Sequence, residues 1–201
     1  MVVTQAALDA LDALIWLNSG YVAAEFCGCH QSSISRRAQE AAAVFGVALV
    51  REKNYWCLSG STVLLELERE VHQLHRLLRG KHLRLDVAPE LIALLPALVA
   101  SPWIAVCAES TIQGRTQLLL QDRVIDGWLT VMPVALSDGQ GAVIAPELSV
   151  HGLGGEFPDG AALMVRHELA GHPVCEQLLG LIGALNDGAA SGARVEKMAV
   201  G

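Results

Sequence analysis

Residues 28–49, GCHQSSISRRAQEAAAVFGVAL, are the stretch that decides the fold. They begin with a polar cluster at 30–33, continue as a helix-compatible run and end at Gly46. Before them, residues 8–17 have the apolar spacing of a helix, which stops at Asn18-Ser19-Gly20. Two helices joined by a tight turn, the second opening with small hydroxyl and amide residues, are typical of a helix-turn-helix that enters the major groove of DNA.

The start of the second helix carries the candidate DNA-binding side chains. Short hydroxyl and amide side chains let a helix approach base edges, whereas arginine reaches phosphate or guanine. The same segment also fits an ordinary capped surface helix, so that alternative stays open at this point. The predicted contacts on this helix are His30, Gln31, Ser32, Ser33, Ser35, Arg36 and Arg37.

A β-hairpin is predicted directly after this helix. Residues 47–50 are suited to a strand, 51–54 read as a polar turn, and 55–58 return as a second strand. Arg51 and Lys53 fall near the tip, where a basic side chain can contact the DNA backbone or minor groove. The order of helices and hairpin predicts a winged helix-turn-helix domain.

An ordered set of residues over 8–80 repeats the pattern of a known family. The matching residues are Ala23-Ala24, Gln31-Ser32-Ser33-Ile34-Ser35-Arg36, Phe45-Gly46-Val47, Leu49 and Leu58-Ser59. In this set the chain resembles the LysR-type transcriptional regulators, whose corresponding run has the form SQPAVSRQI, then LGVQL, then LT. His30 stands where serine is usual, Ser32 where proline is usual and Arg37 where glutamine is usual, and the wing glycine is displaced. The resemblance implies a DNA-binding regulator but no particular operator sequence.

The composition favours a soluble, cytoplasmic protein of two small domains. A chain of 201 residues can hold two, and it contains no apolar stretch of the roughly 18 residues that a membrane helix needs. Asp9 and Asp12 argue against a signal peptide at the N-terminus. Five irregularly spaced cysteines indicate a reducing compartment. Cys27-Gly28-Cys29-His30 lacks the CxxC spacing and a second ligand pair, so we expect thiols that line a turn and no metal.

The net charge of −7 lies outside the predicted DNA-binding part. Residues 1–81 hold eight Lys or Arg and eight Asp or Glu, whereas the remaining 120 residues hold six basic and thirteen acidic side chains. The predicted DNA face has only four cations, Arg36, Arg37, Arg51 and Lys53. Because phosphate contacts supply most non-specific affinity, a monomer should bind DNA weakly, and we expect a homodimer or a tetramer.

A helix over residues 62–79 provides the predicted dimer interface. Its apolar residues follow the a/d spacing of paired helices and are Leu64, Leu67, Val71, Leu74 and Leu78. The stripe could equally pack on its own domain. In the LysR-type family this position holds the linker helix, which pairs with a second subunit. The other faces carry Glu66, Glu68, Arg69, Glu70, Arg76 and Arg79, while His72 and His75 lack a further metal ligand and are expected to face solvent.

The remainder of the chain alternates strands and helices. Strands are predicted at 83–87, 103–107 and 128–132, with helices that begin at Pro89 and Thr111. This βαβαβ order implies a parallel sheet with right-handed crossovers. Effector domains of the family begin in the same way.

The resemblance also shows what the chain lacks. A usual effector domain of the family has two α/β lobes, the second inserted within the first, and binds its inducer between them. Here residues 139–160 are glycine-rich, with short strand candidates at 142–144 and 148–150, followed by a strand at 161–166 and a helix at 174–185. We therefore expect most of the second lobe to be missing and the usual cleft to be incomplete.

A small-molecule effector is left open. The family's ligand-facing positions fall at the carboxyl ends of strands, where α/β sheets bind ligands generally. A pocket needs opposing walls to bury a ligand, so we expect either no inducer or one held by a different surface. The candidate positions are Pro89, Glu90, Ser110, Thr111 and Met132.

No catalytic residue, metal or cofactor is predicted. The segment 167–172 imitates a zinc-protease helix, but its histidines are five residues apart, which separates them by about 140° around a helix. The glycines at 152, 154 and 155 do not open a helix after a strand, as a dinucleotide fingerprint must. We therefore expect a protein that is not an enzyme.

The sequence thus predicts an α/β protein with an N-terminal winged helix-turn-helix, a long linker helix and a truncated parallel-sheet effector lobe. The predicted boundaries are 1–61, 62–80, 81–188 and a flexible tail at 189–201. The predicted function is transcription regulation through double-stranded DNA, without a membrane partner. The alternative is a winged-helix protein-interaction module that lost operator binding and modulates another regulator. A small-molecule sensor without DNA binding is a third, weaker candidate.

Overall fold

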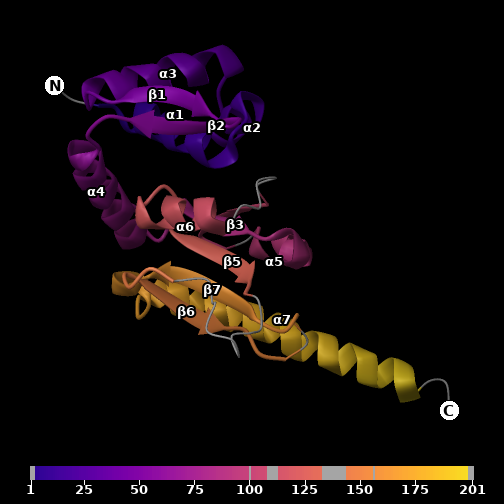
Figure 1. The fold of residues 1–201 in the computed structure, drawn as a ribbon. Helices are drawn as coiled ribbons and strands as arrows, with labels where there is room; N and C mark the ends of the chain where they lie inside the picture. The colour runs from indigo at the N-terminus through magenta and orange to yellow at the C-terminus, as the bar shows by residue number, and fades with distance from the viewer. Residues whose placement is uncertain (1–2, 100, 108–112, 133–143, 156, 199–201) are drawn as a thin grey trace. The chain divides into compact units, whose positions relative to one another are not determined.

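The computed structural model of the chain describes residues 3–99, 101–107, 113–132, 144–155 and 157–198 (Figure 1). The chain divides into two compact units. The N-terminal unit comprises Met1–His75 and Ala108–Ile125, and the C-terminal unit comprises Arg76–Cys107 and Asp126–Gly201.

Three helices begin the N-terminal unit: α1 (Gln5–Leu17), α2 (Gly20–Phe26) and α3 (Gln31–Val44). α1 is buried along most of its length because nearly all its residues are apolar. Asn18 ends it in a left-handed conformation, with φ of 54°, so the predicted break at 18–20 is confirmed. Trp16 is fully buried and packs edge-on against Phe26, with ring centroids 5.5 Å apart.

A hairpin and two further helices complete this unit. β1 (Ala48–Glu52) pairs antiparallel with β2 (Tyr55–Ser59). α4 (Val63–Arg79) follows, within one residue of the predicted helix, and passes into the C-terminal unit at Arg76. α6 (Gln113–Gln121) also belongs to the N-terminal unit.

The C-terminal unit is built on a five-stranded sheet in the order β4-β3-β5-β7-β6. β3, β4 and β5 run parallel, as the predicted βαβαβ order requires, whereas β7 runs antiparallel to both of its neighbours. The connection between β6 and β7 consists of residues 153–160. The strands are β3 (Leu83–Val87), β4 (Trp103–Val106), β5 (Gly127–Val131), β6 (Leu148–Gly152) and β7 (Ala161–Arg166).

One face of the sheet forms the core of this unit. Alternate residues of the strands, such as Leu83, Leu85 and Val87, pack against helical residues such as Leu178 and Ile182. Burial of alternate strand residues against helices supplies most of the stabilisation of such a layer. The helical residues come from η1 (Pro89–Leu94), α5 (Leu95–Leu98), α7 (Pro173–Met198) and the end of α4, which contributes Leu77, and the short turn η2 (His167–Leu169) adds Leu169.

Three helices differ from the prediction. α2 lies between the two helices that the sequence analysis joined by a tight turn. The helix expected to start at Pro89 is split into the 3-10 turn η1 and the short helix α5, in whose first turn Pro96 lacks a backbone N–H. The helix expected over 174–185 continues to Met198, into the predicted tail, where Ala, Arg, Glu and Lys are good helix formers. Thr111 and residues 142 and 143 of one strand candidate lie outside the described residues.

Candidate nucleic-acid interface

α3 has one buried side and one exposed polar side. Its buried residues are Ile34, Ala38, Ala41 and Ala42, which recur at helical spacing. Three of these four are alanines, which lets α3 lie close to the helices beneath it. The opposite side carries the exposed residues Gln31, Ser32, Ser35, Arg36 and Gln39.

The predicted contact residues fall mainly on this exposed side. His30 is exposed and precedes the helix in an extended conformation, without a side-chain capping bond. Ser33 and Arg37 are only partly exposed, because they lie on the flanks of the helix, between its exposed side and its buried side. Arg36 lies 3.6 Å from Glu40, one turn further along, and both side chains are largely exposed. Glu40 therefore competes with any phosphate for Arg36.

The turn between α2 and α3 brings the two helix N-termini together. Gly28 adopts φ of +60°, which favours glycine, and the Cys29 N–H donates to the Ala24 carbonyl at 2.9 Å. Gly20 starts α2 and Gln31 starts α3. A Cβ added to Gly20 would lie 3.4 Å from the side-chain nitrogen of Gln31. The next residue, Tyr21, is 69% exposed and was missed by the sequence analysis. The sequence feature that could have drawn attention to Tyr21 is an aromatic residue directly after the capped start of a helix.

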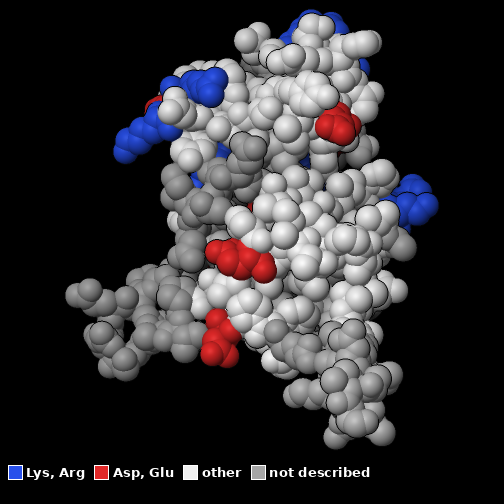
Figure 2. Space-filling model, turned by 90° about the vertical axis from the view of Figure 1, so that its right-hand side faces the viewer, with Lys and Arg blue, Asp and Glu red and all other residues white. Residues whose placement is uncertain are grey.

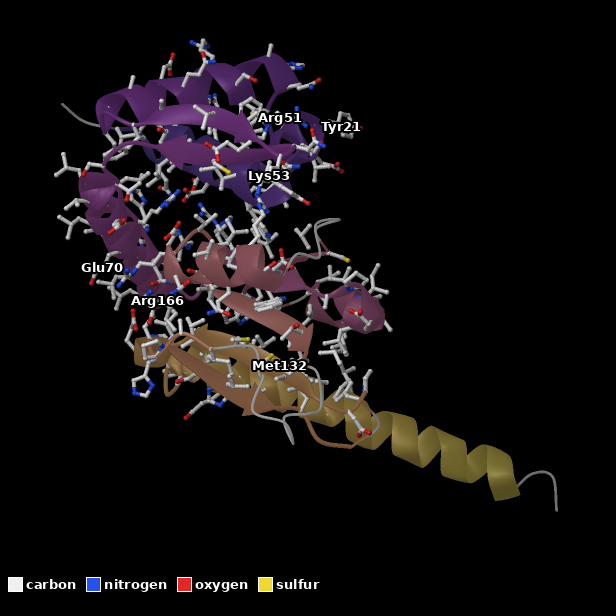
Figure 3. All side chains as sticks on the ribbon, viewed as in Figure 1. Tyr21, Arg51, Lys53, Glu70, Met132 and Arg166 are labelled. Atoms are coloured by element: carbon white, nitrogen blue, oxygen red, sulfur yellow. The ribbon has the colours of Figure 1, made fainter. Side chains whose placement is uncertain are left out.

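The hairpin ends in a two-residue turn. Lys53 and Asn54 both have positive φ, 47° and 70°, the conformation that joins twisted antiparallel strands tightly. The predicted turn at 51–54 was therefore too long, because Arg51 and Glu52 belong to β1. The Arg51 guanidinium lies over the Trp56 ring, 5.7 Å from its centroid. Lys53 is exposed at the tip, as predicted, and Figure 3 labels both basic residues.

Asn18 fastens this turn to the end of α1. Its side-chain nitrogen donates to the Asn54 carbonyl at 2.9 Å, and its side-chain oxygen accepts from the Trp56 N–H at 3.1 Å. The left-handed backbone of Asn18 is tolerated by asparagine better than by most residues. One side chain thus holds the turn and the start of β2 to the end of α1.

Arg115 of α6 makes further contacts with the end of α1 and with the hairpin. Its guanidinium donates to the carbonyls of Ile15 and Trp16, which lie in the last turn of α1. Side chains commonly satisfy carbonyls at the end of a helix. The guanidinium also lies over the Tyr55 ring, 4.8 Å from the centroid. A cation at a helix C-terminus is favourable for the helix dipole.

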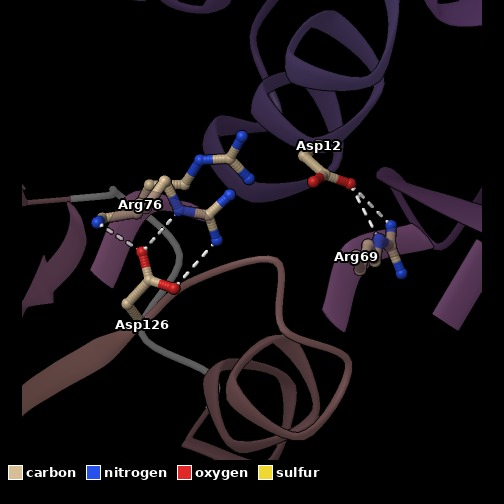
Figure 4. Close-up of polar contacts among 5 residues, drawn as sticks. Asp12, Arg69, Arg76 and Asp126 are labelled. Carbon is tan, nitrogen blue, oxygen red and sulfur yellow. Dashed lines mark hydrogen bonds and ion pairs between the residues drawn. The ribbon is translucent and has the colours of Figure 1, made fainter. Parts of the chain in front are cut away.

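A buried ion pair joins α4 to α1. Arg69 donates through Nε to Asp12 Oδ1 at 2.9 Å, and its Nη2 lies 2.8 Å from the same oxygen (Figure 4). Both side chains are only 2% exposed. The sequence analysis placed Arg69 away from the apolar stripe of α4, and the structure shows that this side of the helix is buried against a carboxylate of α1.

The C-terminal unit has a similar pair. Asp126 is fully buried and accepts from Nε and Nη2 of Arg76 at 3.0 and 2.8 Å, and from the Arg84 backbone N–H at 2.9 Å (Figure 4). The sequence analysis placed Arg76 too away from the apolar stripe, and the structure shows that it is buried. Its partner, Asp126, lies 50 residues later in the chain.

The apolar stripe of α4 is exposed in this chain. The predicted interface residues Leu64, Leu67, Val71, Leu74 and Leu78 are between 52% and 84% exposed, and Val63 is 61% exposed. The buried side of α4 is instead lined by Leu65, Arg69, Gln73, Arg76 and Leu77. The stripe and the buried side of α4 are therefore different sets of residues, as the sequence spacing indicated.

The candidate ligand positions are only partly described. Pro89 follows β3, Met132 follows β5, and these two strands are neighbours in the sheet. Glu90 is exposed, whereas Ser110 and Thr111 lie outside the described residues. Burial and the carboxylates of Asp86 and Glu90 raise the pKa of Cys107, which follows β4, so its thiol is a poor nucleophile at neutral pH.

Within the described ranges, no three His, Cys, Asp or Glu side chains lie close enough together to hold a metal ion. The helices in the same ranges include none with the length and apolarity that crossing a bilayer requires.

Figure 2 shows Lys and Arg side chains on the N-terminal unit, on a face that is otherwise mostly uncharged.

No protein-family model and no curated protein matches the chain. Among solved structures, OxyR from Pseudomonas aeruginosa is 16% identical over 75% of this chain and 53% of that protein, with a TM-score of 0.43. ArgP from Mycobacterium tuberculosis is 21% identical over 76% and 57%, with a TM-score of 0.30. DarR from Vibrio fischeri, solved in complex with DNA, is 19% identical over 77% and 56%, with a TM-score of 0.28.

These proteins are LysR-type regulators, the family that residues 8–80 resemble in sequence. The chain spans about half the length of the solved proteins it matches.

Proposed function

We propose that this chain is a sequence-specific DNA-binding transcriptional regulator that acts as a dimer or higher oligomer. α3 enters the major groove, and the hairpin tip contacts the DNA backbone. The observation that carries the proposal is the exposed side of α3, where Gln31, Ser32 and Ser35 stand beside Arg36 on a helix whose other side is buried. Short polar side chains next to arginine can reach both base edges and phosphates.

The hairpin supports the same placement. Lys53 lies at its tip and Arg51 lies two residues before the turn, and both are exposed. Asn18 fixes the tip to α1 through two hydrogen bonds, so the basic residues are presented by a defined loop. Tyr21, at the start of α2, adds a phenol hydroxyl that can donate to a phosphate.

Dimer formation through α4 completes the proposal. Six large apolar side chains on one helix are more than half exposed. A contiguous apolar stripe of this kind marks an interaction surface, and its 3,4 spacing fits a second copy of the same helix. Two copies would double the four cations per chain, which compensates for their small number.

The direct test is an electrophoretic shift with DNA from the protein's own promoter region, at low salt. We expect a shifted complex, and a folded dimer that gives no shift would contradict the proposal. Arg36→Ala with Arg37→Ala should weaken binding, whereas Arg79→Ala with Lys81→Ala removes two exposed cations elsewhere and should have little effect.

The rival function is a protein-interaction module that no longer binds an operator. The low number of cations on α3 and the hairpin favours it. If it were correct, both double variants would behave like the unmodified chain in the shift assay. Loss of binding in the first variant alone supports the regulator.

A further inference from the structure

A cavity of about 390 Å³ opens beside the edge strand β6 in the C-terminal unit. Its walls are the end of β6, the first part of the connection 153–160 and one side of α7. The apolar lining residues are Leu153, Phe157, Leu179 and Ile182. Sites for small molecules have volumes of roughly 300–1,000 Å³, so this cavity is large enough for one. Pro89, Glu90 and Met132, the positions predicted for an effector, are not part of this lining.

Glycines keep the cavity open. A Cβ placed on Gly152, Gly154 or Gly183 would meet no atom within 4 Å. None of these three glycines has the positive φ that would itself require glycine. A side chain at Gly183 would therefore occupy the cavity without straining α7.

His151 is the one lining residue with a hydrogen-bonding side chain among those described. Its Nε2 is buried and has no hydrogen-bond partner. A buried polar atom without a partner is uncommon in proteins. The torsion that turns an imidazole ring has broad minima, so a modest rotation offers a ring nitrogen to a molecule in the cavity.

We infer that this cavity binds a small, uncharged aromatic compound that carries one hydrogen-bonding group. The ring of the compound packs against Phe157, Leu179 and Ile182, and its polar group pairs with the imidazole of His151. No charged side chain is among the described lining residues, so a strongly charged ligand would have no counter-charge there. The inference does not depend on DNA binding.

Fluorine NMR titration of the full chain with para-fluorophenol and para-fluorotoluene tests this site. The two probes have nearly the same size and differ in the hydroxyl group. We expect both to bind. His151→Leu should lower the affinity for para-fluorophenol by a factor of about 5 and leave that for para-fluorotoluene nearly unchanged, because one hydrogen bond is lost.

Two glycine variants of α7 locate the site. Gly183→Leu fills the cavity and should abolish binding of both probes. Gly180→Leu makes the same change at an exposed position of the same helix that does not line the cavity, and should leave binding unchanged. Because neither position has an atom within 4 Å of its Cβ, both variants are expected to fold. Absence of binding to the unmodified chain, or equal effects of the two glycine variants, would overturn the inference.

Discussion

Replacing Asp12 by Asn should destabilise the N-terminal unit strongly, because it leaves the Arg69 guanidinium buried without its carboxylate. Asp12 Oδ1 lies 2.9 Å from Nε and 2.8 Å from Nη2 of Arg69, and both side chains are 2% exposed. Water cannot take the place of the lost partner at such a site, so the full cost of burying the charge remains.

The magnitude follows from this burial. Removing one partner of a buried ion pair costs about 3–5 kcal/mol, a large part of the roughly 5–15 kcal/mol that holds a typical domain together. Asp12→Leu combined with Arg69→Met removes both charges, and should recover most of the loss. Glu40→Gln is a matched control, because it breaks the ion pair between Glu40 and Arg36, whose side chains are 55% and 68% exposed respectively. This variant should change the free energy of unfolding by less than about 0.5 kcal/mol.

Urea unfolding followed by tryptophan fluorescence measures these differences, since Trp16 is fully buried in the same helix as Asp12. We expect Asp12→Asn to lose at least about 3 kcal/mol. A loss below about 1 kcal/mol, or a double variant less stable than Asp12→Asn, would refute the reasoning about buried charge.

Three further predictions concern α4, Cys175 and Asn18. Leu67→Glu with Leu74→Glu places four carboxylates in a paired α4 interface and should give monomers in sedimentation velocity; an unchanged oligomer would rule this stripe out. Burial and the carboxylates of Asp126 and Glu176 raise the pKa of the Cys175 thiol from 9.0 to about 11. As the pH rises, this thiol ionises at a lower pH in the unfolded chain than in the folded chain, so the free energy of unfolding should fall between pH 9 and about 11. Urea titrations at pH 8 and 10.5 measure this fall, which should be smaller in Cys175→Ala. Asn18→Gly keeps the left-handed backbone but removes both bonds to the hairpin, so the Trp56 amide should lose hydrogen-exchange protection; retained protection would show that the tip is held by other contacts.

Local periodicity predicted most of the secondary structure. The apolar spacing of residues 8–17, the break at Asn18 and the strands at 83–87 and 161–166 each depend on neighbours in the sequence, and the structure confirms them. The spacing of α4 also separated its stripe from its other faces correctly. Whether the stripe was buried could not be read from the spacing, because coiled-coil and core-packing helices share it.

Long-range polar contacts could not be predicted. Asp12 and Arg69 are 57 residues apart, Arg76 and Asp126 are 50 apart, and Arg115 reaches Ile15 across 100 residues. Arginine in an amphipathic helix ordinarily lies in solvent, and only the folded chain shows that a carboxylate is buried beside it. Arg115 gave no signal at all in the sequence, since its partners are backbone carbonyls and one aromatic ring.

The central claim is that α3 binds DNA through its basic, polar side. Fluorescence anisotropy with promoter DNA, repeated across a salt series, tests it most directly. For a dimer, Arg36→Ala with Arg37→Ala removes four cations, so we predict weaker binding and a slope of log K against log salt reduced by up to about 3.6, while Arg79→Ala with Lys81→Ala leaves the slope unchanged. An unchanged slope in the Arg36 and Arg37 variant would contradict the account.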